Sequence, residues 1–428
     1  MPLARVLKNV LIWDADRTNA EYGDVVVDEQ GAIESIQPPN TAKGTVIFDG
    51  KGMTVAIPGL VNAHTHVSMT LLRGLAEELP LMEWLTTKIF PIEDRLGPEH
   101  IRSGAELAML EMIAGGVTCF ADMYYFMDEV AEATLSSGMR AALCRGLPGD
   151  NAEKLRENVE LAERYNGREG RIVVQLGPHA PYTVPMHALE KIAQTAREKN
   201  LGIHFHWLET EGELDAFRNE YKMKPIDYLE KSGLLDAREL ILAHSVWFPT
   251  DELDDVRRPN VTIVHNPKSN LKLGSGYAPI KEMLAAGLNV ALGTDGASSN
   301  NRLDLWDEMR AAALMHKGYY RDPTLVSARD VLRMATVRGA TGVGFRKAGL
   351  IRPGCHADFA LVNIDQPHYV GIDETNVPEF LVYAGSSRDV VATIVAGNIL
   401  YENGKHRTLD KDAVMTKAHE HREWIVKG

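Results

Sequence analysis

The chain has 428 residues and a mass of 47.3 kDa, with 45% hydrophobic and 25% charged residues. These values are ordinary for a globular protein and exclude disorder, collagen or a coiled coil over the whole chain. The formal net charge is −13. This charge disfavours nucleic acid as a partner, because the phosphate backbone is also negative.

The cysteines and the N-terminal segment indicate the compartment. Cys119, Cys144 and Cys355 are far apart and show no CxxC spacing, as expected of buried thiols in a reducing environment. The first residues lack the apolar run of a signal peptide. No stretch approaches the roughly 18 uncharged apolar residues of a membrane span. We therefore expect a cytoplasmic enzyme that does not bind membranes.

Both ends of the chain have the pattern of short β-strands. In residues 1–57 apolar and polar residues alternate between turn residues, which is typical of strands. The same pattern returns in residues 350–428, which end in a terminal helix. Two distant segments of like character predict one small discontinuous β-sandwich domain, built from both termini, beside the inserted segment 58–349.

The inserted segment has a different pattern. Eight apolar runs rich in small or β-branched residues alternate with helical stretches such as 98–116 and 185–200. Eight strands, each followed by a helix, predict an α/β fold of the (β/α)8 TIM barrel type. An open doubly wound sheet is the alternative, but the GxGxxG turn typical of its phosphate sites is missing from the sequence.

Histidines and an aspartate stand at the ends of the predicted strands, where a barrel of this type places its catalytic groups. His64 and His66 are two residues apart, so both side chains point to one face of a strand. An HxH pair alone is a weak signal and is more often explained by surface or core histidines. His206 and Asp295, at two further strand ends, complete a set of three nitrogens and one oxygen. This donor set is typical of a catalytic site for a divalent metal ion, Zn²⁺ first.

The sequence resembles the amidohydrolase superfamily over essentially its whole length. The matching motifs are PGLVNAHTH (58–66), HFHWLE (204–209), LAHS (242–245), GTDG (293–296) and PGCHADFALV (353–362). By this resemblance the metal ligands are His64, His66, His206 and Asp295. The resemblance also implies that the catalytic residues are Glu209, His244 and Asp295.

The number of metal ions follows from a further comparison of motifs. Superfamily members with two metal ions carry a carboxylated lysine at the end of the fourth strand. Here that end reads QLGPHAPYT (175–183) and holds no lysine. The resemblance therefore implies one metal ion per subunit, as in the deaminase branch. Zn²⁺ is the expected ion and Fe²⁺ or Mn²⁺ are the alternatives, because loading also follows availability.

The loop after the first barrel strand, LLRGLAEELPLMEWLTTKIFPIE (71–93), resembles that of the 5′-methylthioadenosine/S-adenosylhomocysteine deaminases. In that family the residue matching Glu93 binds the ribose hydroxyls and the one matching Trp84 walls the thioether side. The matches to Arg145 and His179 contact the 5′ extension and the purine. The remaining substrate-binding residues implied by the resemblance are Glu209 and Asp295.

Each substrate residue also has an ordinary structural explanation. Trp84 could belong to the core, Glu93 could be a solvated helix charge, and Arg145 could form an ion pair. A second arginine that binds a substrate carboxylate in the family has no certain counterpart, although Arg156 is nearby in the sequence. The sequence therefore leaves the strength of S-adenosylhomocysteine binding open.

The resemblance implies a metal-dependent hydrolytic deaminase of 6-aminopurine nucleosides. Its substrates would be 5′-methylthioadenosine, S-adenosylhomocysteine or adenosine, and its products the inosine analogue and ammonia. Glu209 would protonate N1 of the purine, His244 would hydrogen-bond the nucleophile, and Asp295 would accept a proton from water. The resemblance is also compatible with a homo-oligomer.

Two other readings of the sequence remain. A deaminase or chlorohydrolase that acts on guanine, cytosine, a pterin or a triazine would share the metal residues, because substrate identity depends on loops. A barrel that has lost its chemistry would lack some of the ligands or proton carriers.

Overall fold

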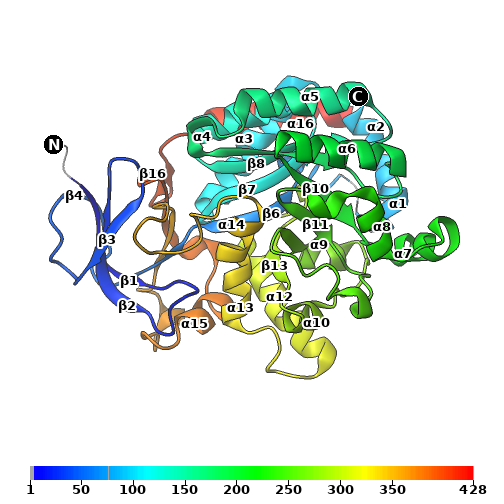
Figure 1. Cartoon of the computed structure of the whole chain (residues 1–428). Helices are drawn as coiled ribbons and strands as arrows, with labels where there is room; N and C mark the ends of the chain where they lie inside the picture. The colour runs from blue at the N-terminus through cyan, green and yellow to red at the C-terminus, as the bar shows by residue number, and fades with distance from the viewer. Residues whose placement is uncertain (1–3, 76, 428) are drawn as a thin grey trace.

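The computed structural model describes residues 4–75 and 77–427, which form two β-sheets (Figure 1). One sheet has eight parallel strands that follow one another in chain order. They are β6 (Leu60–Thr65), β7 (Val117–Tyr124), β8 (Arg140–Leu147), β9 (Ile172–Pro178), β10 (Gly202–Trp207), β11 (Leu240–His244), β12 (Val261–His265) and β13 (Asn289–Leu292). The predicted eight-stranded α/β barrel is confirmed.

Helices cover the outside of the barrel, as Figure 1 shows. The longer ones are α3 (Pro98–Ala114), α4 (Met127–Ser137), α5 (Ala152–Tyr165), α6 (Met186–Lys199), α8 (Pro225–Ser232) and α12 (Leu305–Tyr320). The shorter ones are α1 (Leu81–Trp84), α2 (Phe90–Glu93), α7 (Glu211–Ala216), α9 (Pro267–Lys272), α10 (Ile280–Ala285), α11 (Ala297–Asn300), α13 (Ala328–Arg333), α14 (Gly339–Gly342) and α15 (Val377–Tyr383). The expectation of a helix after every strand is wrong once. Between β11 and β12 the described chain has only the 3₁₀ turn Thr250–Glu252.

The barrel closes between its first and last strands through hydrogen bonds near the carboxyl ends. The side-chain oxygen of Asn62 accepts from the backbone N–H of Thr294 (2.9 Å), and its amide donates to Thr294 Oγ1 (2.7 Å). One residue further on, the backbone N–H of Asp295 donates to the carbonyl of His64 (3.0 Å). This closure places His64, from the first barrel strand, next to Asp295, which follows the last one.

The second sheet combines strands from both ends of the chain, as predicted. They are β1 (Arg5–Ile12), β2 (Glu21–Val27), β3 (Ile33–Gln37), β4 (Thr45–Asp49), β5 (Thr54–Pro58), β14 (Phe359–Asn363), β15 (Val390–Val395), β16 (Asn398–Glu402) and β17 (Lys405–His406). The two halves join where β5 pairs with β14 in antiparallel fashion. The chain passes from β5 to β6 through Gly59, where a Cβ atom would lie 2.1 Å from Thr118 Oγ1. Only glycine allows this close approach of the two sheets.

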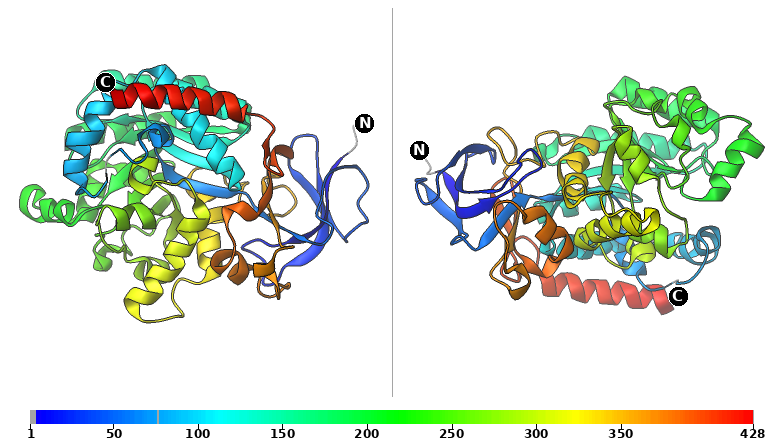
Figure 2. Two further views of the ribbon diagram at one scale, coloured as in Figure 1. Left: turned by 180° about the vertical axis from the view of Figure 1, so that it is seen from behind. Right: turned by 90° about the horizontal axis from the view of Figure 1, so that it is seen from below.

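The terminal helix α16 (Lys411–Lys427) leaves the second sheet and lies along α3 of the barrel (Figure 2). The Arg422 side chain donates to the carbonyl of Leu71 (2.5 Å) in the 3₁₀ turn Val67–Leu72, which follows His66. Within the described residues, no helix combines the length and the apolar composition that a membrane crossing requires.

A buried ion pair links the barrel to the second sheet. Arg140 begins β8 and Asp358 precedes β14, and both side chains are only 2% exposed. The guanidinium donates to both carboxylate oxygens, at 2.7 and 3.1 Å. Each side chain makes one further hydrogen bond. Arg140 donates to the carbonyl of Gly170, and Asp358 accepts from the N–H of Ala396 (both 2.8 Å). Removing one partner would leave a charge unpaired in the interior.

We predict that Asp358→Ala lowers the free energy of unfolding by about 3–5 kcal/mol, because Arg140 would remain buried without its counter-ion. Urea denaturation followed by circular dichroism measures the change. Asp16→Ala is the matched control, since Asp16 pairs with Arg352 at 60% exposure on both sides and such pairs contribute about 0–1 kcal/mol. Equal destabilisation by both variants would contradict the role of the buried pair.

Candidate metal centre

Four barrel segments bring their polar side chains to one point at the carboxyl ends of the strands. His64 belongs to β6, His206 to β10 and His244 to β11, while Asp295 follows β13. One nitrogen each of His64, His66 and His206 lie within 4.8 Å of one another, and so do ligand atoms of His64, His244 and Asp295. The structure thus brings together all four residues that the sequence predicts as metal ligands.

Hydrogen bonds on the far side of each ring fix which nitrogen faces the centre. Nδ1 of His66 donates to the carbonyl of Met123 (2.6 Å), and Nδ1 of His206 donates to the carbonyl of His179 (2.9 Å). The Nε2 atoms of His66 and His206 consequently face each other at 3.4 Å. Bonds of this kind to the second nitrogen are typical of histidines that bind metal.

Asp295 faces two of these rings. Its Oδ1 lies 3.2 Å from Nε2 of His66 and 3.5 Å from Nε2 of His64. Its Oδ2 accepts from the hydroxyls of Ser269 (2.7 Å) and Ser299 (2.8 Å). Burial opposes the charge, but the nearby His64 and His66 rings hold the pKa of Asp295 well below its usual range. This carboxylate is therefore ionised and has one oxygen directed at the centre.

The residues fit a divalent cation. Nδ1 of His64 is bonded to Nε2 of His204 (2.7 Å), and its own Nε2 is buried without a hydrogen-bond partner. Burial lowers the pKa of His64 to about 3, so this ring is neutral as a metal ligand must be. Burial acts in the same direction on His66, but Asp295 raises its pKa to about 9. A cation between the same atoms would replace that proton, because metal binding competes with protons for the imidazole lone pair.

Two further groups with acid–base chemistry lie beside the centre. Nδ1 of His244 is 2.8 Å from Asn270 Oδ1 and 3.8 Å from Glu209 Oε1. Glu209 is 5% exposed, and burial raises its pKa. The carboxylate of Glu213 accepts from the backbone N–H groups of Leu208 (2.6 Å) and Glu209 (3.2 Å) and so fixes the turn that carries Glu209. Glu209 is thus a buried carboxyl group held in a fixed position beside the centre.

The backbone at these positions adopts an unusual conformation. Leu208, His244 and Asp295 have positive φ angles of 48°, 73° and 61°. Such angles cost of order 1–3 kcal/mol each in residues other than glycine and persist only where the surroundings enforce them. Strain of this kind concentrates at functional sites, which agrees with the placement of the polar side chains.

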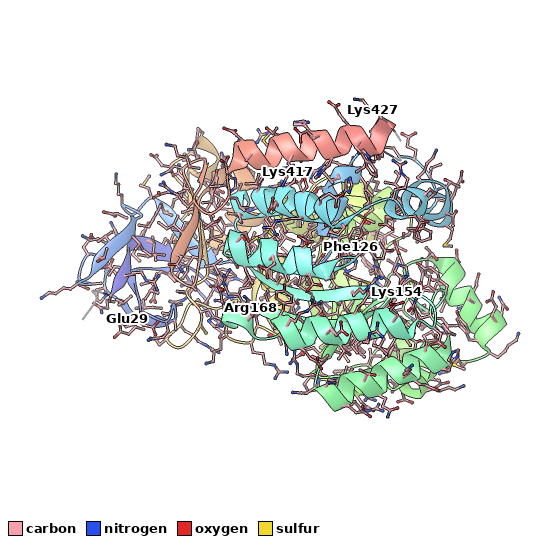
Figure 3. The ribbon with its side chains drawn as sticks, turned by 90° about the horizontal axis from the view of Figure 1, so that it is seen from above. Glu29, Phe126, Lys154, Arg168, Lys417 and Lys427 are labelled. Carbon is pink, nitrogen blue, oxygen red and sulfur yellow. The ribbon has the colours of Figure 1, made fainter. Side chains whose placement is uncertain are left out.

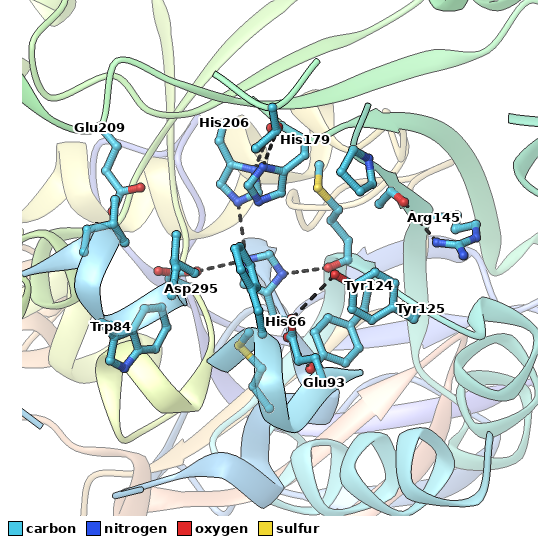
Figure 4. A pocket seen from close by; sticks show the side chains of 18 of the residues that line it. His66, Trp84, Glu93, Tyr124, Tyr125, Arg145, His179, His206, Glu209 and Asp295 are labelled. Atoms are coloured by element: carbon cyan, nitrogen blue, oxygen red, sulfur yellow. Dashed lines mark hydrogen bonds and ion pairs between the residues drawn. The ribbon is translucent and has the colours of Figure 1, made fainter. Parts of the chain in front are cut away.

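The centre forms the floor of a cavity of about 520 Å³ (Figure 4). Every substrate residue expected from the sequence lines this cavity: Trp84, Glu93, Arg145, His179, Glu209 and Asp295. Glu93 is 8% exposed, and its Oε1 accepts from the hydroxyl of Tyr124 (2.6 Å). Burial raises the pKa of Glu93 to about 7. Glu93 is therefore a buried carboxylate in the cavity wall and not a solvated helix charge.

The two arginines considered from the sequence differ in their positions. Arg145 lines the cavity and forms an ion pair with Glu157. Arg156 is 65% exposed and pairs with Glu153 (3.6 Å) and Glu160 (3.5 Å) on the surface of α5. It is not among the residues that line the cavity.

The sequence analysis did not identify the residues that form hydrogen bonds to the site residues and so fix their positions. Asp122 at the end of β7 accepts from the backbone N–H of Val67 (2.7 Å) and so fixes the turn after His66. The other missed partners are His204 as the partner of His64, Asn270, Ser269, Ser299 and Tyr124. Half of these residues belong to strands and half to the short helices α9 and α11, and common polar residues at such positions do not reveal their partners.

Comparisons with known proteins agree with this geometry. The model of the amidohydrolase family matches residues 55–400. A 5-methylthioadenosine/S-adenosylhomocysteine deaminase of Dictyoglomus thermophilum is 45% identical over 385 residues, which are 89% of each chain. A 5′-deoxyadenosine deaminase of Methanosarcina mazei is 41% identical over 431 residues, 98% of each chain. An adenosine deaminase structure from Xanthomonas campestris with bound zinc is 31% identical, with a TM-score of 0.93 over 100% of this chain and 99% of that one. The chain belongs to the amidohydrolase family.

Proposed function

We propose that this protein is a hydrolytic deaminase of 6-aminopurine nucleosides, with 5′-methylthioadenosine, S-adenosylhomocysteine and adenosine as candidate substrates. The observation that carries this proposal is the convergence of His64, His66, His206 and Asp295 beside Glu209 on the floor of one cavity. The names of the three relatives described above support the same chemistry, since each is the name of a nucleoside deaminase.

In this proposal the four residues hold one Zn²⁺ ion, with Fe²⁺ or Mn²⁺ as alternatives. Three imidazole nitrogens and one carboxylate oxygen suit an ion of borderline softness. Zinc in the related adenosine deaminase structure supports this choice. When bound, the ion lowers the pKa of coordinated water from about 15.7 to about 7, which makes it a nucleophile at neutral pH.

The chain's own residues move the protons of the reaction. Asp295 is ionised, so it can accept a proton from the attacking water as the new C6–O bond forms. Glu209, whose pKa is raised by burial, donates a proton to N1 so that negative charge does not build up on the ring. His244 hydrogen-bonds the attacking oxygen. The proton accepted by Asp295 passes to the 6-amino group, the C6–N bond breaks and ammonia leaves. The remaining proton of the C6 hydroxyl returns to Glu209 as the 6-oxopurine forms.

The cavity wall recognises the rest of the nucleoside. The Glu93 carboxylate accepts hydrogen bonds from the ribose hydroxyls, and Tyr124 fixes its orientation. His179 contacts the purine; burial lowers its pKa to about 4, so it acts as a neutral ring. Trp84 is 5% exposed and supplies an apolar wall beside the 5′ substituent. In this proposal the substrate is a small nucleoside that binds in this cavity.

Ammonia release from a panel of compounds tests the proposal directly. The panel holds 6-aminopurine nucleosides together with guanine, cytosine, pterins and triazines. We expect turnover of the nucleosides and at least about 100-fold lower kcat/KM for the others, because only nucleosides offer hydroxyls to the buried Glu93. A preference for any of the other rings would replace the nucleoside assignment.

The metal assignment predicts that His64→Ala and Asp295→Ala each lower bound zinc and kcat together. A lost ligand weakens metal binding by at least about 10-fold. Plasma mass spectrometry of the purified protein measures the metal, and ammonia release measures turnover. His187→Ala is the control, because His187 is 68% exposed and pairs only with Asp150 at the surface. Full metal content and full rate in either ligand variant would contradict the assignment.

The proton-transfer role predicts that Glu209→Gln retains the metal but lowers kcat on the order of 100-fold or more, the usual contribution of a general acid. The amide keeps the size of the side chain but cannot deliver a proton. Glu211→Gln, an exposed position two residues away, serves as the control. Turnover close to that of the unmodified enzyme would remove Glu209 from the mechanism.

The ribose-binding role predicts that Glu93→Gln lowers kcat/KM for adenosine by about 10- to 100-fold, the worth of hydrogen bonds to a charged group. The loss should be much smaller for 2′,3′-dideoxyadenosine. Since the pKa of Glu93 is raised to about 7, lowering the pH through 7 protonates it and should lower the ratio of the KM for dideoxyadenosine to the KM for adenosine toward one. Steady-state kinetics with both compounds measures this. An equal loss for both compounds would show that Glu93 does not bind the hydroxyls.

A further inference from the structure

The outer rim of the cavity carries charges that the reaction at C6 does not use. We define this rim by three lining residues: Arg145 at the end of β8, Lys154 in the first turn of α5, and Asp94 directly after α2. Asp94 is exposed and Lys154 is half-buried, whereas the metal-centre residues are buried. Figure 3 shows Lys154 and Phe126, another lining residue, at the same end of the molecule, away from the terminal sheet.

The charge of Arg145 is paired within the protein. Its Nε donates to the carboxylate of Glu157, which lies in α5 one turn after Lys154. Its Nη1 donates to the carbonyl of Gly146 (3.0 Å), and the guanidinium lies 5.6 Å from the ring centre of Tyr125. The side chain of Arg145 is 15% exposed, and that of Glu157 is 47% exposed. The arginine is therefore held against the wall with its counter-ion in place.

Together with Glu157, which pairs with Arg145 but is not among the residues that line the cavity, the charges at the rim cancel. Arg145 and Lys154 are cations, and Asp94 and Glu157 are carboxylates. Below the rim much of the cavity wall is apolar, with Leu81, Leu85, Phe90, Leu96 and Met123 among its lining residues. An uncharged 5′ substituent meets apolar surface there and disturbs no ion pair. A carboxylate at the 5′ end can use Arg145 only beside the negative charge of Glu157.

We propose that Glu157 is a specificity-determining residue that acts through Arg145. By pairing with the guanidinium, it makes the enzyme favour nucleosides with an uncharged 5′ substituent over those with a 5′ carboxylate. Methylthioadenosine represents the first class, and S-adenosylhomocysteine, with its amino-acid tail, represents the second. The discrimination is a difference between two binding free energies, to which the unfavourable Glu157–carboxylate contact contributes. This inference rests on the proposed function.

The test compares kcat/KM for methylthioadenosine and S-adenosylhomocysteine in the metal-loaded enzyme and its variants. We expect the unmodified enzyme to prefer methylthioadenosine. Glu157→Gln should raise kcat/KM for S-adenosylhomocysteine about fivefold, the upper range for a partly exposed ion pair. The gain should appear in KM, because the tail is remote from C6. For methylthioadenosine the change should stay within about twofold.

Two further variants separate a charge effect from a structural one. Glu157→Asp keeps the charge and should restore the preference of the unmodified enzyme. Glu153→Gln is the matched control, since Glu153 lies on the same helix and pairs with Arg156 at the surface. It should leave both substrates unaffected.

Several outcomes would overturn the inference. One is an equal change for both substrates in Glu157→Gln, and another is an unmodified enzyme that prefers S-adenosylhomocysteine. A specific loss of S-adenosylhomocysteine turnover in Glu157→Gln would also overturn it, because Glu157 would then bind the ammonium group of the tail. A metal-loaded enzyme that deaminates neither nucleoside would instead contradict the proposed function itself.

Discussion

The metal centre depends on a structure that holds several imidazole rings close together in a buried space. The ring centre of His64 lies 5.0 Å from that of His66, 4.8 Å from that of His206 and 5.2 Å from that of His244. Buried polar nitrogens are unfavourable without partners, and a cation between these rings would satisfy them. The donor set is therefore a site shaped for a cation, and the surrounding structure has to hold it in that shape.

The barrel supplies this support from its own backbone. Carbonyls of Met123 and His179 bind the outer nitrogens of two rings, and both carbonyls belong to neighbouring strand ends. The closure through Asn62 and Thr294 fixes the distance between the first strand and the Asp295 turn. Because the partners are parts of rigid strands, the ligands keep their geometry without help from flexible loops.

The sequence alone predicts the parts of this structure that depend on local pattern. Apolar runs predict the eight strands, and the HxH pair of His64 and His66 marks the end of the first one. The sequence does not predict contacts between segments that are far apart in the chain. The helix α16 packs on α3 of the barrel, and Asp122 fixes the turn after His66. Such contacts depend on the tertiary arrangement, which common polar residues do not encode locally.

In the proposed function, chemistry and recognition depend on different parts of the structure. The candidate ligands and proton carriers stand at strand ends, whereas Trp84 and Glu93 belong to the segment after β6, and Lys154 and Glu157 belong to α5. Relatives of similar identity are named for different 5′ substituents. A helix residue such as Glu157 can change the charge offered to that substituent without moving any strand that holds the centre. Within this family, substrate preference can therefore shift by substitution at the rim while the centre and its supporting bonds stay the same.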